Sequence, residues 1–253
     1  MNLHLEKWMQ LRNQLPVYPV SSIGDFSLAR RVMPLGDRAQ CYDPYQGLLF
    51  VAPNPVEYTA TRLLERHIVW MSDTQLEVMG NARILEGVRG DVLTAGLGMG
   101  IFAYLAALQP GVVSVTVVEK SQEVVDLVGP VIAHPKLKVL RGDVHETFKM
   151  HKGLYDFVYL DIWANLQSPT LEYAKYKRLA RPCLKAGGET HIWLEELTKR
   201  VLPLLPRKPV ANSGMTNSPC LVCSKTLRHD FAGLCMDCAD LFGVSDLFQK
   251  RRS

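Results

Sequence analysis

The sequence lacks any long hydrophobic run and any strong excess of one charge. Its longest apolar stretch, Ile101 to Leu108, is far short of the ~20 residues that a membrane-spanning helix needs. Met1 to Leu15 carries charges throughout and has no apolar core, which excludes a typical signal peptide. The net charge of +4 permits an anionic substrate without demanding one. We therefore expect a cytoplasmic protein with no membrane partner.

Cysteine is scarce over most of the chain, and internal repeats and low-complexity tracts are absent. Cys41 and Cys183 are expected to be packed thiols, while the other four cysteines form two C-x-x-C pairs near the C-terminal end. In a chain without a secretory signal, such pairs favour a metal over disulfides. The 253 residues, 47% of them hydrophobic, suit one α/β domain with a small appendage.

The first part of the chain predicts a helix followed by short strands. Apolar positions in residues 1–15 recur on one helical face. Prolines, glycines and short apolar runs between Val17 and Pro55 predict a small antiparallel sheet. We assign residues 1–55 to an N-terminal helix and a small antiparallel β segment. A further helix is expected after Ser72-Asp73-Thr74, because these side chains suit a helix N-cap.

Residues 56–205 show a regular alternation of predicted strands and helices. The predicted strands are 91–95, 112–118, 137–141, 157–160 and 190–194, and the predicted helices between and after them are 101–109, 122–128, 171–184 and 197–205. Such alternation implies βαβ units, and hence an α/β, Rossmann-like, mostly parallel sheet with flanking helices. Residues 206–219, rich in proline and small polar residues, are expected to be a linker.

A glycine-rich loop joins the first of these strands to the first helix. Gly96, Gly98 and Gly100 would let the backbone turn sharply and approach a ligand closely, with the positive end of the helix dipole behind them. A dinucleotide fingerprint would have another glycine where Ile101 stands. The close G-x-G-x-G spacing therefore favours S-adenosylmethionine over a pyrophosphate.

Three acids follow at the ends of the next three predicted strands. Glu119 is placed to accept the ribose hydroxyls, although an acid there also suits NAD. Asp143 could accept from an adenine amino group, and Asp161 would stand beside the reacting centre. Ligands of open α/β sheets bind at this edge, so the combination predicts cofactor binding. A Rossmann-like sheet that binds no ligand is the alternative.

The segments 94–100, 117–120, 141–143 and 155–161 resemble class I S-adenosylmethionine-dependent methyltransferases, most closely the spermidine synthase-like branch. The resemblance implies that Gly96, Gly98 and Gly100 lie against the methionine part of the cofactor. It also implies that Glu119 binds the ribose, that Asp143 lies near the adenine and that Asp161 lies at the reaction centre.

The resemblance extends to the segment before the expected helix. Val69 to Thr74 is similar to the stretch of that branch that lines the active site. This implies a place near the substrate for Trp70 and Asp73, and the same geometry implies one for Trp163.

Departures from the branch leave the substrate class open. The corresponding loop of aminopropyltransferases resembles G-G-G-D-G. In this chain Met99 stands at the position of the acid. Their strand-four acid is followed by a second aspartate that grips the polyamine, but Asp161 is followed by Ile-Trp-Ala-Asn165. This run also differs from the Asn/Asp-Pro-Pro-Tyr/Phe of amino-directed nucleic-acid methyltransferases.

The cysteine pairs predict a zinc-ribbon-like module within residues 220–253, which also hold a basic tail. Eleven residues separate the two C-x-x-C pairs, whose members are Cys220, Cys223, Cys235 and Cys238. Four thiolates can surround Zn²⁺ at about 2.3 Å and leave no open position, so the metal would be structural. Such a small module would draw its folding free energy from the metal. His229 is an alternative ligand. Basic residues around the pairs could contact a nucleic acid or a protein partner.

These features together predict an S-adenosylmethionine-dependent transferase, most simply a methyltransferase of unknown acceptor. Asp161 would orient or deprotonate the acceptor. One alternative is an aminopropyltransferase-like polyamine enzyme. Another is a non-catalytic Rossmann scaffold that uses its zinc module for partner recognition. A homo-oligomer is compatible with each of these.

Overall fold

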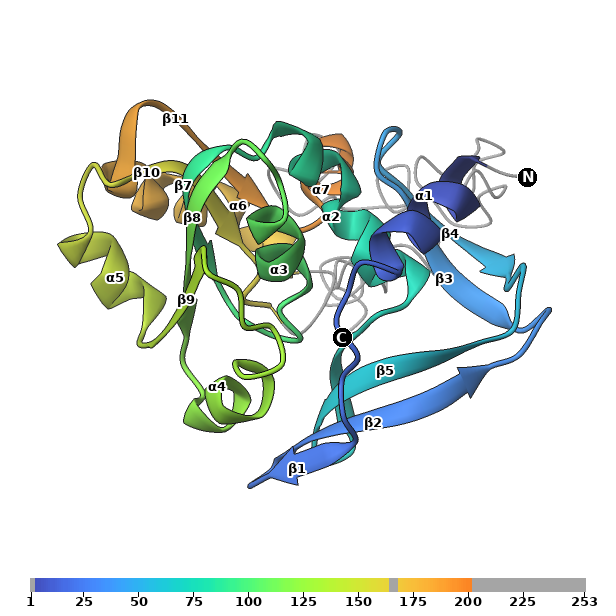
Figure 1. Ribbon diagram of the computed structural model, residues 1–253. Helices are drawn as coiled ribbons and strands as arrows, with labels where there is room; N and C mark the ends of the chain where they lie inside the picture. Colours follow the sequence, from blue (N-terminus) through green and yellow to red (C-terminus); the bar gives the residue numbers. More distant parts are fainter. Residues whose placement is uncertain (1–2, 164–167, 202–253) are drawn as a thin grey trace, which may run out of the picture.

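The computed structural model describes residues 3–163 and 168–201, and its centre is a five-stranded parallel sheet (Figure 1). The strand order is β11-β10-β7-β8-β9. The strands are β7 (Gly90–Ala95), β8 (Val112–Glu119), β9 (Leu137–Arg141), β10 (Tyr155–Leu160) and β11 (Leu184–Ile192). Every residue from Val92 to Ala95 is buried, as expected of a central strand covered on both faces. The predicted α/β class is confirmed.

Helices cover both faces of this sheet and create two apolar cores. Alternate residues of the central strands face opposite sides, so Val92 and Phe157 lie in one core while Leu93 and Val158 lie in the other. The first core includes α2 (Gln75–Gly87), α3 (Ile101–Ala107) and α4 (Gln122–Val128). The second includes α5 (Val144–Met150) and α6 (Ser168–Ala180), which runs into a short 3₁₀ turn, η1 (Arg181–Cys183). The helix α7 (Glu195–Val201) follows β11.

The N-terminal part contains α1 (Leu3–Arg12) and two antiparallel sheets. One sheet has the order β1-β2-β5-β6, with β1 (Ser21–Ile23), β2 (Phe26–Met33), β5 (Tyr58–Glu65) and β6 (Ile68–Ser72). The other is the hairpin of β3 (Arg38–Asp43) and β4 (Leu48–Pro53). The predicted helix and antiparallel strands are therefore present, and the N-terminal antiparallel sheet continues beyond residue 55. Strand β5, assigned from sequence to the Rossmann-like part, pairs with β2 along its full length, from Phe26 opposite Glu65 to Met33 opposite Tyr58.

Contacts between the two parts place the end of β6 and the start of α2 over the carboxyl edge of the parallel sheet. The amide of Met99, in the glycine loop between β7 and α3, donates a 3.2 Å hydrogen bond to the sulfur of Met71 in β6. The buried hydroxyl of Tyr18 donates a 2.7 Å hydrogen bond to the carbonyl of Met99 in the glycine loop. The N-terminal sheet therefore forms one wall of the space at the carboxyl ends of the parallel strands.

Several sequence predictions concern residues outside the described ranges. The linker 206–219 and the zinc module with its four cysteines lie there. Cys41 and Cys183 are free and buried, which confirms that they are packed thiols. In residues 3–163 and 168–201, no helix has the length and apolar character to cross a membrane, and no cluster of three or more His, Cys, Asp or Glu side chains could hold a metal.

Candidate functional site

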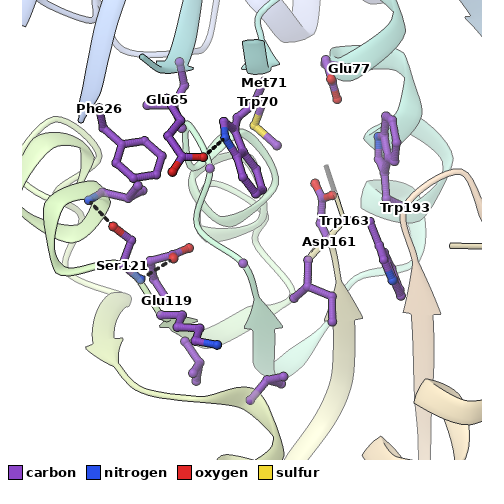
Figure 2. A pocket seen from close by; sticks show the side chains of 18 of the residues that line it. Phe26, Glu65, Trp70, Met71, Glu77, Glu119, Ser121, Asp161, Trp163 and Trp193 are labelled. Atoms are coloured by element: carbon purple, nitrogen blue, oxygen red, sulfur yellow. Dashed lines mark hydrogen bonds between the residues drawn. The ribbon is translucent and has the colours of Figure 1, made fainter. Parts of the chain in front are cut away.

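A cavity of about 630 Å³ opens at the carboxyl ends of the parallel strands (Figure 2). One wall comes from the ends of β7, β8 and β10, and the opposite wall comes from β5, β6 and the first turn of α2. The volume lies within the range of about 300–1,000 Å³ that is typical of small-molecule and cofactor sites. Most of the residues predicted from sequence lie on its lining: Gly96, Gly98, Glu119, Asp143 and Asp161 from the sheet edge, with Trp70 and Trp163.

The glycine loop needs its glycines for close approach as well as for conformation. Gly96 has φ of 88°, and a Cβ there would lie 1.9 Å from the backbone oxygen of Asp161. Gly98 has φ of 50°, and a Cβ there would lie 2.7 Å from the sulfur of Met71. Any larger residue would push the loop away from both walls. Gly100 caps α3 and is buried, and it does not line the cavity.

Glu119 ends β8 and fastens the loop beside it. One carboxylate oxygen accepts a 2.8 Å hydrogen bond from the amide of Leu97, and the other accepts a 2.8 Å bond from the amide of Ser121. An ionised carboxylate has about four acceptor positions, so each oxygen can still accept one further donor. This arrangement fits two adjacent hydroxyl groups, such as those of a ribose.

Asp143 also caps a helix, a role that was not predicted from the sequence. Its side chain caps α5, a helix that was not predicted, by accepting a 2.8 Å hydrogen bond from the amide of His145. The other carboxylate oxygen lies 3.9 Å from the ammonium nitrogen of Lys120. The residue faces the cavity, and any contact that it makes with a ligand adds to its role as a helix cap.

Asp161 follows β10 and lines the cavity (Figure 2). Burial of its carboxyl group raises its pKa to about 7. Glu77, from the first turn of α2, also lines the cavity and was not predicted. Burial, and then the nearby charge of Asp161, raise the pKa of Glu77 well above its usual value. The one sequence signal for Glu77 is an acid between the buried residues Leu76, Val78 and Met79 of a helix.

Three tryptophans line this cavity, two of them predicted. The indole nitrogen of Trp70 donates a 2.8 Å hydrogen bond to Glu65, and that of Trp163 donates a 2.7 Å bond to Glu172. Trp163 also packs edge-on against Tyr176, with 5.4 Å between ring centroids. Trp193, which follows β11, was missed because its position depends on how the sheet edge meets α2.

Asp73 does not line the cavity, so its predicted place at the substrate is corrected. One oxygen of its buried carboxylate accepts a 2.7 Å hydrogen bond from the amide of Thr61. The other forms a 3.1 Å ion pair with Arg12. Asp73 therefore links α1 and β5 to the start of α2. Both oxygens of its carboxylate are used by Thr61 and Arg12.

Comparisons with known proteins add only distant likenesses. No protein-family model and no curated protein sequence matches the chain. Among solved structures, it is similar to a Methanococcus maripaludis protein provisionally described as an S-adenosylmethionine-dependent methyltransferase, with 18% identity and a TM-score of 0.36 over 48% of this chain and 59% of that one. It is similar to spermidine synthase from Thermotoga maritima, with 10% identity and a TM-score of 0.42 over 74% and 73% of the two chains. A SAM-dependent methyltransferase from Leishmania major has 12% identity and a TM-score of 0.37 over 46% and 48%. The chain thus spans less than two thirds of the first and third of these proteins.

Proposed function

We propose that the protein is an S-adenosylmethionine-dependent transferase, most simply a methyltransferase. The observation that carries the proposal is one cavity that gathers a close-packed glycine loop and three acids from the ends of successive strands. Ligands of open α/β sheets bind at this edge. The residues at this edge fit the cofactor, because Glu119 keeps free acceptor positions and the glycines leave room for close approach.

The roles of the individual residues follow from their surroundings. The bound cofactor would supply a reactive methyl group on a sulfonium. Glu119 would hold the ribose, and Asp143 would lie on the adenine side. Asp161, with a pKa of about 7, can accept a proton from an acceptor and can also orient one. The walls from β6 and α2 would exclude water and align the acceptor with the methyl group, which is where most of the rate enhancement would arise.

Calorimetric titration with S-adenosylhomocysteine tests the cofactor assignment. We expect binding by the wild-type protein and a loss of roughly 1–3 kcal/mol in Glu119→Ala, the scale for removing an acceptor of hydrogen bonds. Glu6→Ala is a matched control, because Glu6 is exposed on α1. Equal affinities for the wild-type protein and Glu119→Ala would remove Glu119 from the site.

Aminopropyl transfer is a second candidate, supported by the charge of the cavity. Five acids line it, namely Glu65, Glu77, Glu119, Asp143 and Asp161, whereas its described lining includes one lysine, the exposed Lys120, and no arginine. The carboxylate of S-adenosylmethionine would find little positive charge here, and a decarboxylated donor would avoid that cost. Tighter binding of decarboxylated S-adenosylmethionine than of S-adenosylmethionine would favour this candidate.

We also propose that Cys220, Cys223, Cys235 and Cys238 bind one structural Zn²⁺. The support is the spacing of the two C-x-x-C pairs. The module would serve the recognition of a partner, either a nucleic acid or a protein, because a closed four-thiolate site offers no position for catalysis. Self-association into a homo-oligomer is a further proposal, tested by the molar mass in solution.

A further inference from the structure

Both backbone groups of Met99, in the glycine loop, pair with side chains from the N-terminal part of the chain. Its amide donates a 3.2 Å hydrogen bond to the sulfur of Met71, and its carbonyl accepts a 2.7 Å hydrogen bond from the hydroxyl of Tyr18. In contrast, the amide of Leu97 in the same loop donates to Glu119, within the Rossmann-like part. Two segments that are distant in sequence therefore hold the loop at one residue.

The two contacts complement each other. The hydroxyl of Tyr18 is buried, and burial raises the pKa of Tyr18 far above its usual value, so the hydroxyl stays protonated and donates at any physiological pH. Met71 lines the cavity and lies directly on the loop (Figure 2). A Cβ at Gly98 would be 2.7 Å from the sulfur of Met71 and 2.8 Å from its methyl carbon. Because a thioether is a weak acceptor, this close packing adds to the hold of Met71 on the loop.

Tyr18 and Met71 are both attached to the four-stranded N-terminal sheet. Met71 is in β6 and lies opposite Leu63 of β5. The carbonyl of Tyr18 accepts a 3.4 Å hydrogen bond from the guanidinium of Arg30 in β2, the strand that pairs with β5 along its full length. A displacement of this sheet would therefore act on both sides of Met99 at once.

The same sheet also forms the wall that faces the strand ends. Leu63, Trp70 and Met71 of this sheet line the cavity, as do Gly96 and Gly98 of the loop on the opposite wall. A molecule on the wall and a nucleoside on the loop would thus bind to two connected parts. Each would shift the protein toward the arrangement that it binds better, and the connection would pass this preference to the other part.

We propose that Tyr18 and Met71 are positioning residues that couple the N-terminal sheet to the glycine loop, so that a molecule bound to one promotes binding to the other. This inference rests on the proposed transferase function and assigns a form of regulation to the same site. Occupancy of the loop by the nucleoside would hold the sheet in the position that receives the acceptor. Because coupled binding equilibria are reciprocal, an acceptor on the wall would raise the affinity for the nucleoside by the same factor.

A reporter on the sheet, outside the cavity, tests the coupling. The ring of Trp8 is buried and packs edge-on against Tyr58 of β5, with 4.9 Å between ring centroids, and Trp8 is not among the residues that line the cavity. Its indole N–H signal in a nitrogen–proton NMR spectrum of the full chain is assigned with Trp8→Phe. We expect saturating S-adenosylhomocysteine to shift this signal in the wild-type protein, and to shift it at least ~2-fold less in Tyr18→Phe and in Met71→Leu.

The affinity for S-adenosylhomocysteine gives a second readout. We expect Tyr18→Phe and Met71→Leu each to weaken binding by about 3- to 10-fold, the scale of one hydrogen bond. Met71→Gln provides an oxygen acceptor on a side chain of similar length, and should restore most of the affinity and of the Trp8 shift. Tyr45→Phe is the matched control, because it removes a hydroxyl that bonds to Glu86 at the surface, and it should change neither readout.

The outcomes separate this inference from the function on which it rests. A Trp8 signal that does not respond in the wild-type protein, or that responds equally in Tyr18→Phe and Met71→Leu, would overturn the coupling and leave the transferase function standing. Binding by Met71→Gln as weak as by Met71→Leu would also overturn it, since the hydrogen bond would then not position the loop. If S-adenosylhomocysteine does not bind the wild-type protein, the transferase function and the coupling both fail.

Discussion

Replacing Asp161 by asparagine should stabilise the ligand-free protein, even though the residue is proposed to act in catalysis. Burial raises the pKa of Asp161 from 3.8 to about 7. A tenfold change in proton affinity corresponds to about 1.4 kcal/mol, so the ionised carboxylate costs up to about 4 kcal/mol at pH 8. Because the carboxyl group faces a cavity that admits water, we expect a gain of about 2–4 kcal/mol in the free energy of unfolding.

The pH dependence distinguishes this explanation from a general packing effect. Asp161 binds its proton more tightly in the folded chain than in the unfolded chain. Between about pH 4 and pH 7 the folded state therefore holds more protons, and its stability falls as the pH rises through this range. Urea unfolding at pH 5 and pH 8 should show a larger gain for Asp161→Asn at pH 8. Asp37→Asn, at an exposed position, is the control. A loss of stability at pH 8, or an equal gain at both pH values, would show that burial does not raise the pKa of Asp161.

Three further predictions concern the loop, the second acid and the metal. Gly96→Ala should abolish binding of S-adenosylhomocysteine, because the new Cβ would clash with the oxygen of Asp161; calorimetry that shows wild-type affinity would contradict the proposed closeness of loop and strand. Glu77→Gln should also stabilise the ligand-free protein at pH 8, since the pKa of Glu77 is raised; denaturant midpoints equal to wild type would show that Glu77 is well solvated. Elemental analysis should find one zinc per chain that is lost in Cys235→Ser; less than about half an equivalent in protein purified without chelator would count against the site.

The parallel sheet could be predicted from sequence because its signals are local. Each strand is a short apolar run, all but the strand 137–141 are followed by a predicted helix, and parallel strands end at one edge. This topology places Gly96, Glu119, Asp143 and Asp161 around a common space without knowledge of any long-range contact. The helix α5 was missed because it is only seven residues long, although Asp143 is a typical N-cap.

The facing wall could not be predicted, because it depends on pairing between distant segments. Strand β5 finds its partner β2 across the hairpin of β3 and β4, so a boundary drawn after the prolines near residue 55 separated paired strands. The environment of Asp73 depends on Arg12, sixty-one positions away in the sequence, and this ion pair removes Asp73 from the cavity. Trp193 lies against Gly80 of α2 because this helix packs on the chain that follows β11. Sequence periodicity predicts which face of a helix is apolar. It does not predict that Glu77, on the apolar face of α2, borders a cavity.

The cavity is proposed to bind an S-adenosylmethionine-type nucleoside and not a dinucleotide. The most direct test is calorimetric titration of the wild-type full chain with S-adenosylhomocysteine and, separately, with NADH. The arrangement of the glycine loop and Glu119 predicts one equivalent of S-adenosylhomocysteine bound per chain and no binding of NADH at the same concentration. Binding of NADH in place of S-adenosylhomocysteine, or binding of neither, would contradict the proposed cofactor.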